Sequence, residues 1–274
     1  MHRPDLVASD VDGTLLDPYQ YITERTARVI SRVLAGGTPF VLVTGRPPRW
    51  VPAVAAAAGL TGYAVCANGA SIFHIGDDEV RHVWELSPLQ LHDIASAITS
   101  ALPETRVAAE RTLLGHDYSA PIAIEHGFDN PWGNPDGETD LPVLVPRAEV
   151  LGKPATKLLV RHPGMTSRQM AEVVETVLAD MPIEVTYSSN NGLLEISAGG
   201  VTKASGLEWV CRELAVDPER VVAFGDMPND VPMLGRVGHG VAMANAHEDL
   251  LAVADEVTAP NSEDGVAQVL ERWF

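Results

Sequence analysis

The order of the elements along the chain is the sequence feature that most constrains its fold. Short apolar runs typical of buried strands alternate with patterns typical of amphipathic helices, one capped by Thr23 and another starting at Ser205. The strand-like runs occupy residues 6–8, 40–43, 64–67, 221–224 and 240–243. Such alternation is typical of a parallel sheet covered by helices. The sequence therefore predicts an α/β fold with a Rossmann-like parallel sheet as its core.

The middle of the chain follows a different order. The elements expected there are a helix at 89–101, a strand near Val107, a strand at 157–160, a helix at 166–179 and a strand at 183–187. The turn residues 189–192 then predict a hairpin into a second run at 193–196. We therefore expect an α+β cap domain at residues 84–188, inserted into a core formed by residues 1–83 and 189–274. Within the insertion, residues 115–154 are rich in proline and too long for an ordinary loop, which indicates irregular cap structure or a functional loop.

Two carboxylates and a glycine follow the first apolar run, in the sequence Asp10-Val11-Asp12-Gly13-Thr14. If this segment continues the strand, positions 10 and 12 point the same way, and both carboxylates face one spot. A divalent metal ion or a phosphoryl group would explain two like charges held so close. A solvated Asp-Gly turn would explain the same residues by local hydrogen bonding. The pentapeptide alone leaves both interpretations open.

Further polar clusters are expected at strand ends or at the start of a helix. Thr44, Gly45 and Arg46 follow the second strand, where a hydroxyl and turn amides suit phosphate oxygens. Lys203, one of only three lysines in the chain, precedes a predicted helix. It is either a surface lysine or a compact cation for a phosphoryl oxygen or a carboxylate. Residues 225–230 place acids after the fourth strand, and an oxygen-rich, sulfur-free site of this kind prefers a hard cation such as Mg²⁺.

Charge and cysteine content exclude some classes of protein. The formal net charge is −18, from 19 Lys and Arg against 37 Asp and Glu, which argues against nucleic acid or an anionic membrane as partner. Cys66 and Cys211 lie in apolar segments and are interpreted as reduced core residues. We see neither a secretory signal nor an apolar run near the ~20 residues that span a bilayer, so we expect a cytoplasmic protein. The sequence gives no indication of oligomeric state.

Taken together, these motifs resemble the haloacid dehalogenase (HAD) superfamily of phosphohydrolases, and within it the Cof-type branch, subfamily IIB, with a large inserted cap. The resemblance covers essentially the whole chain. The matching segments, in family order, are residues 10–14, 44–46, 67–70, 200–203, 225–230 and 241–246. The resemblance implies a HAD-like core with an inserted cap that supplies substrate specificity.

The resemblance also implies roles for the acidic residues. Asp10 is expected to be the nucleophile that forms an aspartyl-phosphate intermediate, and Asp12 the general acid and base. Mg²⁺ is expected to be held by the carboxylates of Asp10 and Asp226 and by the backbone carbonyl of Asp12. Asp230 is expected to orient a water on the metal or Lys203.

Other positions that match the family are expected to hold the phosphoryl group or to support the site. Thr44, Gly45 and Lys203 would grip phosphoryl oxygens, and Asn229 would join them or fix its loop. Arg46 would reach a substrate anion or pair with a nearby acid. For Asn68 we favour a structural role beneath the rim of the site, since an Asn-Gly pair is also an ordinary turn.

The expected activity is a Mg²⁺-dependent phosphatase for a small phosphorylated metabolite, with sugar phosphates favoured by the resemblance. Polar groups in the cap such as Asp117, Glu125, Asn130 and Asn134 identify no ligand, and Trp132 either packs or contacts substrate. One alternative is a sugar phosphomutase of the phosphomannomutase type, which would isomerise its substrate without releasing inorganic phosphate. A second is a non-catalytic phospho-acceptor or interaction protein, against which the acid/base position and the large cap argue.

Overall fold

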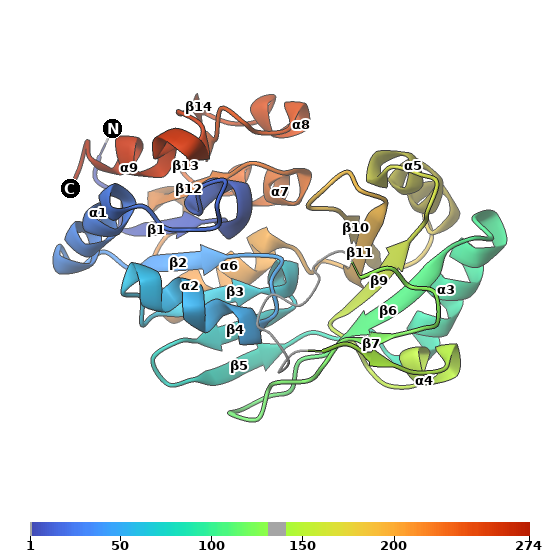
Figure 1. The fold of residues 1–274 in the computed structure, drawn as a ribbon. Helices are drawn as coiled ribbons and strands as arrows, with labels where there is room; N and C mark the ends of the chain where they lie inside the picture. Colours follow the sequence, from blue (N-terminus) through green and yellow to red (C-terminus); the bar gives the residue numbers. More distant parts are fainter. Residues whose placement is uncertain (1, 131–140) are drawn as a thin grey trace. The chain divides into compact units, whose positions relative to one another are not determined.

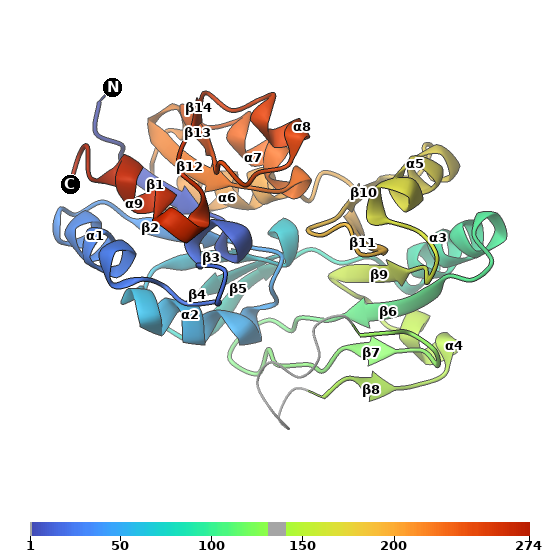
Figure 2. The same ribbon diagram turned by 45° about the horizontal axis from the view of Figure 1, so that its top comes forward.

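The computed structural model describes residues 2–130 and 141–274, and the chain forms two compact units. The first comprises Met1–His82, Leu114–His116 and Thr202–Phe274, and the second comprises Val83–Leu113 and Asp117–Val201. Figures 1 and 2 show the ribbon from two directions. Trp132 and Asn134 lie outside the described residues.

The first unit is built on an eight-stranded sheet with the order β14-β13-β12-β1-β2-β3-β4-β5. Its strands are β1 (Leu6–Ser9), β2 (Phe40–Val43), β3 (Tyr63–Cys66), β4 (Ser71–His74), β5 (Glu79–Val83), β12 (Val221–Gly225), β13 (His239–Ala242) and β14 (Glu256–Val257). The strands from β14 to β3 are parallel, which confirms the predicted parallel core. The antiparallel strand β4 and the edge strand β5 were not predicted. Because β1 lies between β2 and β12, the connections leave it in both directions, and its carboxyl end is a topological switch point.

Helices connect these strands and pack against one another. They are α1 (Glu24–Ala35), α2 (Val51–Ala58), α6 (Lys203–Glu213), α7 (Val231–Leu234), α8 (Glu248–Leu251) and α9 (Gly265–Leu270). The side chain of Thr23 caps α1, as predicted, and α1 contacts α2 and α9, whereas α6 contacts α7. We expected the helix of α6 to start at Ser205, but it begins at Lys203. The reason is that the Thr202 side chain accepts a hydrogen bond from the Ser205 N–H and so caps the helix one residue before Lys203.

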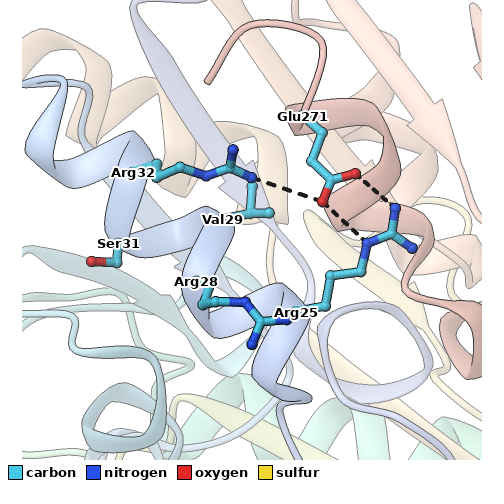
Figure 3. Close-up of a pocket in the computed structure, with 6 residues that line it drawn as sticks. All are labelled: Arg25, Arg28, Val29, Ser31, Arg32 and Glu271. Carbon is cyan, nitrogen blue, oxygen red and sulfur yellow. Dashed lines mark hydrogen bonds and ion pairs between the residues drawn. The ribbon is translucent and has the colours of Figure 1, made fainter.

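A shallow surface pocket lies between α1 and the end of α9 (Figure 3). Arg25 of α1 pairs with Glu271, with Nη2 and Oε2 2.7 Å apart, and Arg32 reaches the same carboxylate at 3.8 Å. Arg28 instead pairs with Glu24. The pocket contains none of the predicted site residues, and its arginines have acidic partners on the protein itself.

The second unit contains a six-stranded sheet with the order β10-β11-β9-β6-β7-β8. Its elements are β6 (Arg106–Glu110), β7 (Ala123–Ile124), β8 (Val143–Leu144), β9 (Lys157–Arg161), β10 (Ile183–Thr186) and β11 (Leu193–Ala198), with helices α3 (Pro88–Ala101), α4 (Arg147–Leu151) and α5 (Ser167–Val177). The expected turn at 189–192 joins β10 to β11, which pair antiparallel. Since β11 also pairs with β9, the inserted unit continues to Val201, beyond the boundary that we expected at residue 188.

The proline-rich segment at 115–154 contains regular structure where it is described, namely β7, β8 and α4. Glu125 in this segment does not present its carboxylate as an open cap group. It is buried, accepts a hydrogen bond from the Val107 N–H at 2.6 Å and pairs with Arg147 at 3.0 Å. These contacts indicate a structural role for Glu125.

The cysteines and the lengths of the helices bear on the class of protein. Cys66 and Cys211 are both free and buried, as their apolar surroundings in the sequence predicted. Within the part of the chain that the structure describes, every helix is too short or too polar to cross a membrane.

Candidate active site

All of the predicted site residues belong to the first unit. The parallel strands β1, β2 and β12 end at one edge of the sheet, and the residues that follow each of them carry the predicted polar side chains. Lys203 joins them from the start of α6, where it is almost completely buried. The order of motifs in the sequence is therefore converted by the fold into one polar cluster.

The two acids of the first motif differ in burial and in their partners. Strand β1 ends at Ser9, so positions 10 and 12 do not follow the alternation of a strand. Asp10 is 5% exposed, whereas the side chain of Asp12 is 49% exposed. Gly13 follows with a φ of +77°, and a Cβ there would lie 2.2 Å from Oδ2 of Asp226. Only glycine fits this turn, which passes directly over the second acidic motif.

Lys203 is the centre of the buried cluster. Its Nζ donates to Oδ1 of Asp10 at 2.6 Å and to Oδ1 of Asp230 at 2.7 Å. Burial alone would lower the pKa of Lys203, but the two carboxylates outweigh that effect and raise the pKa. For Asp10, burial raises the pKa of the carboxyl group well above its usual range, although Lys203 opposes the shift. The lysine is therefore a fixed ammonium ion, and the surface-lysine interpretation is wrong.

Asp230 holds this arrangement in place. Its Oδ1 accepts from Lys203, and its Oδ2 accepts from the backbone N–H groups of Asp226 and Met227, both at 3.1 Å. Each oxygen thus has a protein donor, and the side chain is fully buried. Through these hydrogen bonds Asp230 holds Lys203 and the turn after β12.

Asp226 is the acid best placed to complete a metal site with Asp10. Thr14 donates from Oγ1 to Oδ1 of Asp226 at 3.0 Å. Burial raises the pKa of Asp226 to about 7, and the nearby Asp230 carboxylate adds to the shift. Carboxylate oxygens of Asp10, Asp226 and Asp230 all lie within 4.8 Å of one another. Three carboxylates against one ammonium group leave an excess of negative charge, so the cluster could hold a divalent cation, and its all-oxygen donors suit a hard ion.

Uncharged groups of Thr44, Gly45 and Asn68 follow β2 and β3. Thr44 is buried, and its Oγ1 accepts from the backbone N–H of Arg46 at 3.1 Å. Asn68 has a left-handed φ of +59°, and its N–H donates to the Thr44 carbonyl at 3.0 Å. The ideal Cβ position at Gly45 lies 3.0 Å from Oδ1 of Asn68, so Gly45 lets this loop approach closely.

Asn68 also contacts the loop after β12. Its Oδ1 accepts from Nδ2 of Asn229 at 3.1 Å, so the Asn68 side chain holds this loop. Oδ1 of Asn229 is buried and has no hydrogen-bond partner among the described residues. In this orientation Asn229 offers an acceptor, which suits a hydroxyl group or water and does not suit a phosphoryl oxygen.

Arg46 pairs with an acid, one of the two roles that the sequence left open. Its Nε donates to Oδ2 of Asp12 at 2.8 Å, and its Nη2 donates to Oδ1 at 2.6 Å. Nη2 also donates to Oε1 of Gln20 at 3.0 Å. No role was predicted for Gln20 or for the Thr14 hydroxyl. Thr14 lies within the first motif, but nothing in the sequence singles out Gln20.

Comparisons with known proteins place this site in a family. The chain matches the family of haloacid dehalogenase-like hydrolases over residues 7–270, and it belongs to that family. It is 32% identical over 282 residues to the 5-amino-6-(5-phospho-D-ribitylamino)uracil phosphatase YitU of Bacillus subtilis (strain 168), covering 99% of this chain and 98% of that protein. It is 26% identical over 280 residues to the pyridoxal phosphate phosphatase YbhA of Escherichia coli (strain K12), covering 97% of each.

Solved structures show the same fold. A haloacid dehalogenase-like hydrolase from Bacteroides thetaiotaomicron superposes with a TM-score of 0.76 at 25% identity, covering 100% of both chains. A HAD subclass IIB sugar phosphatase gives a TM-score of 0.80 at 22% identity, covering 98% of both chains. The chain is a HAD-type phosphatase, a phosphoric monoester hydrolase, and the expected family, fold class and enzyme class are confirmed.

Proposed function

We propose that this protein is a Mg²⁺-dependent phosphatase that hydrolyses a small phosphorylated metabolite through an aspartyl-phosphate formed on Asp10. The observation that carries the proposal is the buried contact of Lys203 with Oδ1 of Asp10 at 2.6 Å, beside the carboxylate of Asp226. A buried carboxylate with an ammonium group on one oxygen is held in one orientation, which favours attack by a defined atom.

In the first step, Oδ2 of Asp10 attacks phosphorus while Lys203 holds Oδ1. A bond forms between the Asp10 oxygen and phosphorus, and the bond between phosphorus and the ester oxygen breaks. The leaving alcohol oxygen takes a proton from Asp12, which acts as general acid.

In the second step, a water molecule attacks the phosphorus of the aspartyl-phosphate. Asp12, now a carboxylate, takes a proton from that water. The bond between phosphorus and Asp10 breaks, inorganic phosphate leaves, and both side chains return to their starting states.

The remaining residues position the phosphoryl group and a cation. Asp10 and Asp226, with the backbone carbonyl of Asp12, would hold Mg²⁺, which when bound offsets the repulsion between an anionic carboxylate and an anionic phosphate. Thr44, Gly45 and Lys203 would bind phosphoryl oxygens through a hydroxyl, a backbone amide and an ammonium group.

For the substrate, we favour the phosphate ester of a sugar or a sugar alcohol. The relative YitU acts on a phosphorylated ribitylamino compound, whose ribityl arm is a sugar alcohol. Supporting this choice, the second unit carries polar side chains such as Asp117 and Asn130 that suit a leaving group rich in hydroxyls. We assign the choice of leaving group to this second unit.

A phosphate-release assay tests the proposal. The purified protein with Mg²⁺ is offered a panel of monoesters that includes sugar phosphates, sugar alcohol phosphates and pyridoxal phosphate. We expect release of inorganic phosphate from at least one ester and none from an Asp10→Asn variant that keeps the wild-type circular dichroism spectrum. An isomerised product without free phosphate would indicate a mutase, and no turnover of any ester would contradict the proposal.

A further inference from the structure

The side chain of Asp12, to which we assign proton transfer, is held by the planar guanidinium group of Arg46. Both oxygens of Asp12 accept from Arg46, at 2.6 and 2.8 Å, although the Asp12 side chain is half exposed. Such a bidentate contact fixes the plane of the carboxylate as well as its position. A half-exposed aspartate without this contact would sample several rotamers, and few of them would serve proton transfer to a bound ester.

Arg46 is itself fixed at its two ends. Its backbone N–H donates to Oγ1 of Thr44 at 3.1 Å, which ties the start of the side chain to the turn after β2. At the other end, Nη2 donates to Oε1 of Gln20 at 3.0 Å as well as to Asp12. Gln20 therefore contacts the same nitrogen that holds the general acid.

The backbone around Gln20 is unusual and firmly held. Gln20 has a φ of +68°, in the left-handed region that few residues other than glycine adopt. Asp17 maintains this turn, since its Oδ1 accepts from the N–H groups of Tyr19 and Tyr21, both at 2.9 Å. The carbonyl of Asp17 accepts from the N–H of Gln20 itself, also at 2.9 Å. Backbone strain of this kind persists where the surroundings over-determine it, commonly at functional sites.

We propose that Gln20 is a positioning residue for the general acid, acting through Arg46, so that Gln20, Arg46 and Asp12 form one hydrogen-bonded chain. The proposal rests on the proposed function, because it assumes that Asp12 carries the proton. Gln20 touches neither the phosphoryl group nor the leaving alcohol in this scheme. It keeps the guanidinium group of Arg46 in the plane that presents the Asp12 carboxylate to the ester oxygen.

The test compares two leaving groups. An alkyl ester such as glycerol 2-phosphate needs a proton on its departing oxygen, whereas p-nitrophenyl phosphate releases a stable anion without one. The value of kcat/KM covers the steps up to departure of the leaving group, so it isolates the use of Asp12 as an acid. We expect Gln20→Ala to lower kcat/KM about tenfold for glycerol 2-phosphate and less than about twofold for p-nitrophenyl phosphate, a fraction of the range of general acid catalysis.

Two further variants separate positioning from loop stability. Gln20→Glu keeps an acceptor oxygen for Arg46 and is expected to restore most of the activity on the alkyl ester. Tyr19→Ala removes the neighbouring side chain, which is 80% exposed, and is expected to leave both substrates unaffected. An equal loss on both substrates with Gln20→Ala, or no loss on either, would overturn the proposal.

Asp12→Asn serves as the reference that separates this proposal from the proposed function. Asp12→Asn should lower kcat/KM more for glycerol 2-phosphate than for p-nitrophenyl phosphate, as Gln20→Ala should, but by a larger factor. If Asp12→Asn lowers kcat/KM equally for both esters, Asp12 is not the acid, and the proposed proton step fails together with the role of Gln20. If Asp12→Asn lowers kcat/KM mainly for the alkyl ester and Gln20→Ala does not, only the role of Gln20 is wrong.

Discussion

Each of the two units buries a lysine against a carboxylate, and the two contacts differ in their surroundings. In the first unit, Nζ of Lys203 contacts Asp10 and Asp230, and a third carboxylate, that of Asp226, lies close by. In the second unit, Nζ of Lys157 contacts Oε2 of Glu195 at 2.6 Å, and both side chains are nearly as buried as Lys203.

The difference lies in the charge that remains after pairing. Around Lys203, three carboxylates face one ammonium group, and burial together with the neighbouring carboxylates raises the pKa values of Asp10 and Asp226, so the protein alone does not balance their ionised forms. At Glu195, the Ser188 hydroxyl donates to Oε1 at 3.0 Å while Lys157 holds Oε2, so both oxygens have donors. We infer that the excess of carboxylates around Lys203 serves to bind a cation and to react. The contact of Lys157 with Glu195, whose oxygens both have donors, stabilises the fold.

Replacing the lysine of the first unit is expected to have the largest effect. Lys203→Met keeps the length of the side chain but removes the charge that holds Asp10 and binds phosphoryl oxygens. Loss of one such electrostatic contact lowers kcat/KM by about 10²–10³-fold. The measurement is phosphate release under saturating Mg²⁺, with circular dichroism as the check on folding. A Lys203→Met variant that kept more than a tenth of the wild-type kcat/KM would show that Lys203, like Lys157, has a structural role.

The matched replacement in the second unit should change stability and leave catalysis alone. Lys157→Met leaves Glu195 buried without its ammonium partner, which costs about 3–5 kcal/mol of unfolding free energy. Urea denaturation measures this loss, and we expect kcat/KM to stay within about twofold at a temperature where the variant is folded. The double variant Lys157→Met with Glu195→Leu should recover most of the stability. A large rise in KM in the folded single variant would show that this pair contacts substrate.

The sequence predicted the acidic cluster because parallel strands end at one edge of a sheet. Asp10, Thr44 and Asp226 follow strands of one sheet, so their convergence needs only the strand order. The direction of Asp12 could not be predicted, since it depends on where β1 stops and on the left-handed turn at Gly13. Gln20 gave no signal, because the hydrogen bonds of its loop, and not its residue type, determine its conformation.

The boundary of the second unit escaped prediction for a different reason. The predicted hairpin already pairs residues 193–196 with the expected strand at 183–187, so the boundary expected at residue 188 divided a pair of strands. The local turn does not specify the pairing of β11 with β9, more than thirty residues away in the chain, which places β11 inside the second sheet. The end of the inserted unit therefore depends on a non-local strand pair, whereas local motifs indicated the strands of the core.

Replacing one acid of the buried cluster around Lys203 with a neutral residue should raise the stability of the fold and weaken the binding of Mg²⁺. Asp226→Asn removes a charge that the fold disfavours, so the metal-free variant should be more stable than wild type by about 1–3 kcal/mol at pH 8. Because folding raises the pKa of Asp226 to about 7, the stability that its protonated form contributes is complete below about pH 4 and is lost as pH rises through about 7. The two proteins should therefore be equally stable near pH 4. Thermal denaturation without Mg²⁺ at both pH values checks this.

The same variant should bind Mg²⁺ at least about tenfold more weakly, as expected when a ligand is lost. In wild type, protons compete with the cation at Asp226, so Mg²⁺ affinity should rise with pH up to about 7 and then level off. Calorimetric titration of Mg²⁺ between pH 5.5 and pH 8 measures both effects. A stability gain without loss of Mg²⁺ affinity would show that Asp226 is not a ligand, although the excess charge is real.

The smallest expected effect is that of the Thr14 hydroxyl on the pKa of Asp226. Thr14→Val keeps the buried shape but removes the hydrogen bond to Oδ1 of Asp226, which costs about 1 kcal/mol of stability. That bond lowers the pKa of Asp226, so without it the pKa should rise above about 7, and the pH at which Mg²⁺ affinity levels off should move upward. We expect a loss of Mg²⁺ affinity of up to about tenfold at pH 7. Thr14→Ser, which keeps the hydroxyl, should leave the pH profile in place. If valine and serine shift it equally, the methyl packing of Thr14 and not its hydroxyl supports Asp226, and the charge of the cluster is set by burial and by Asp230.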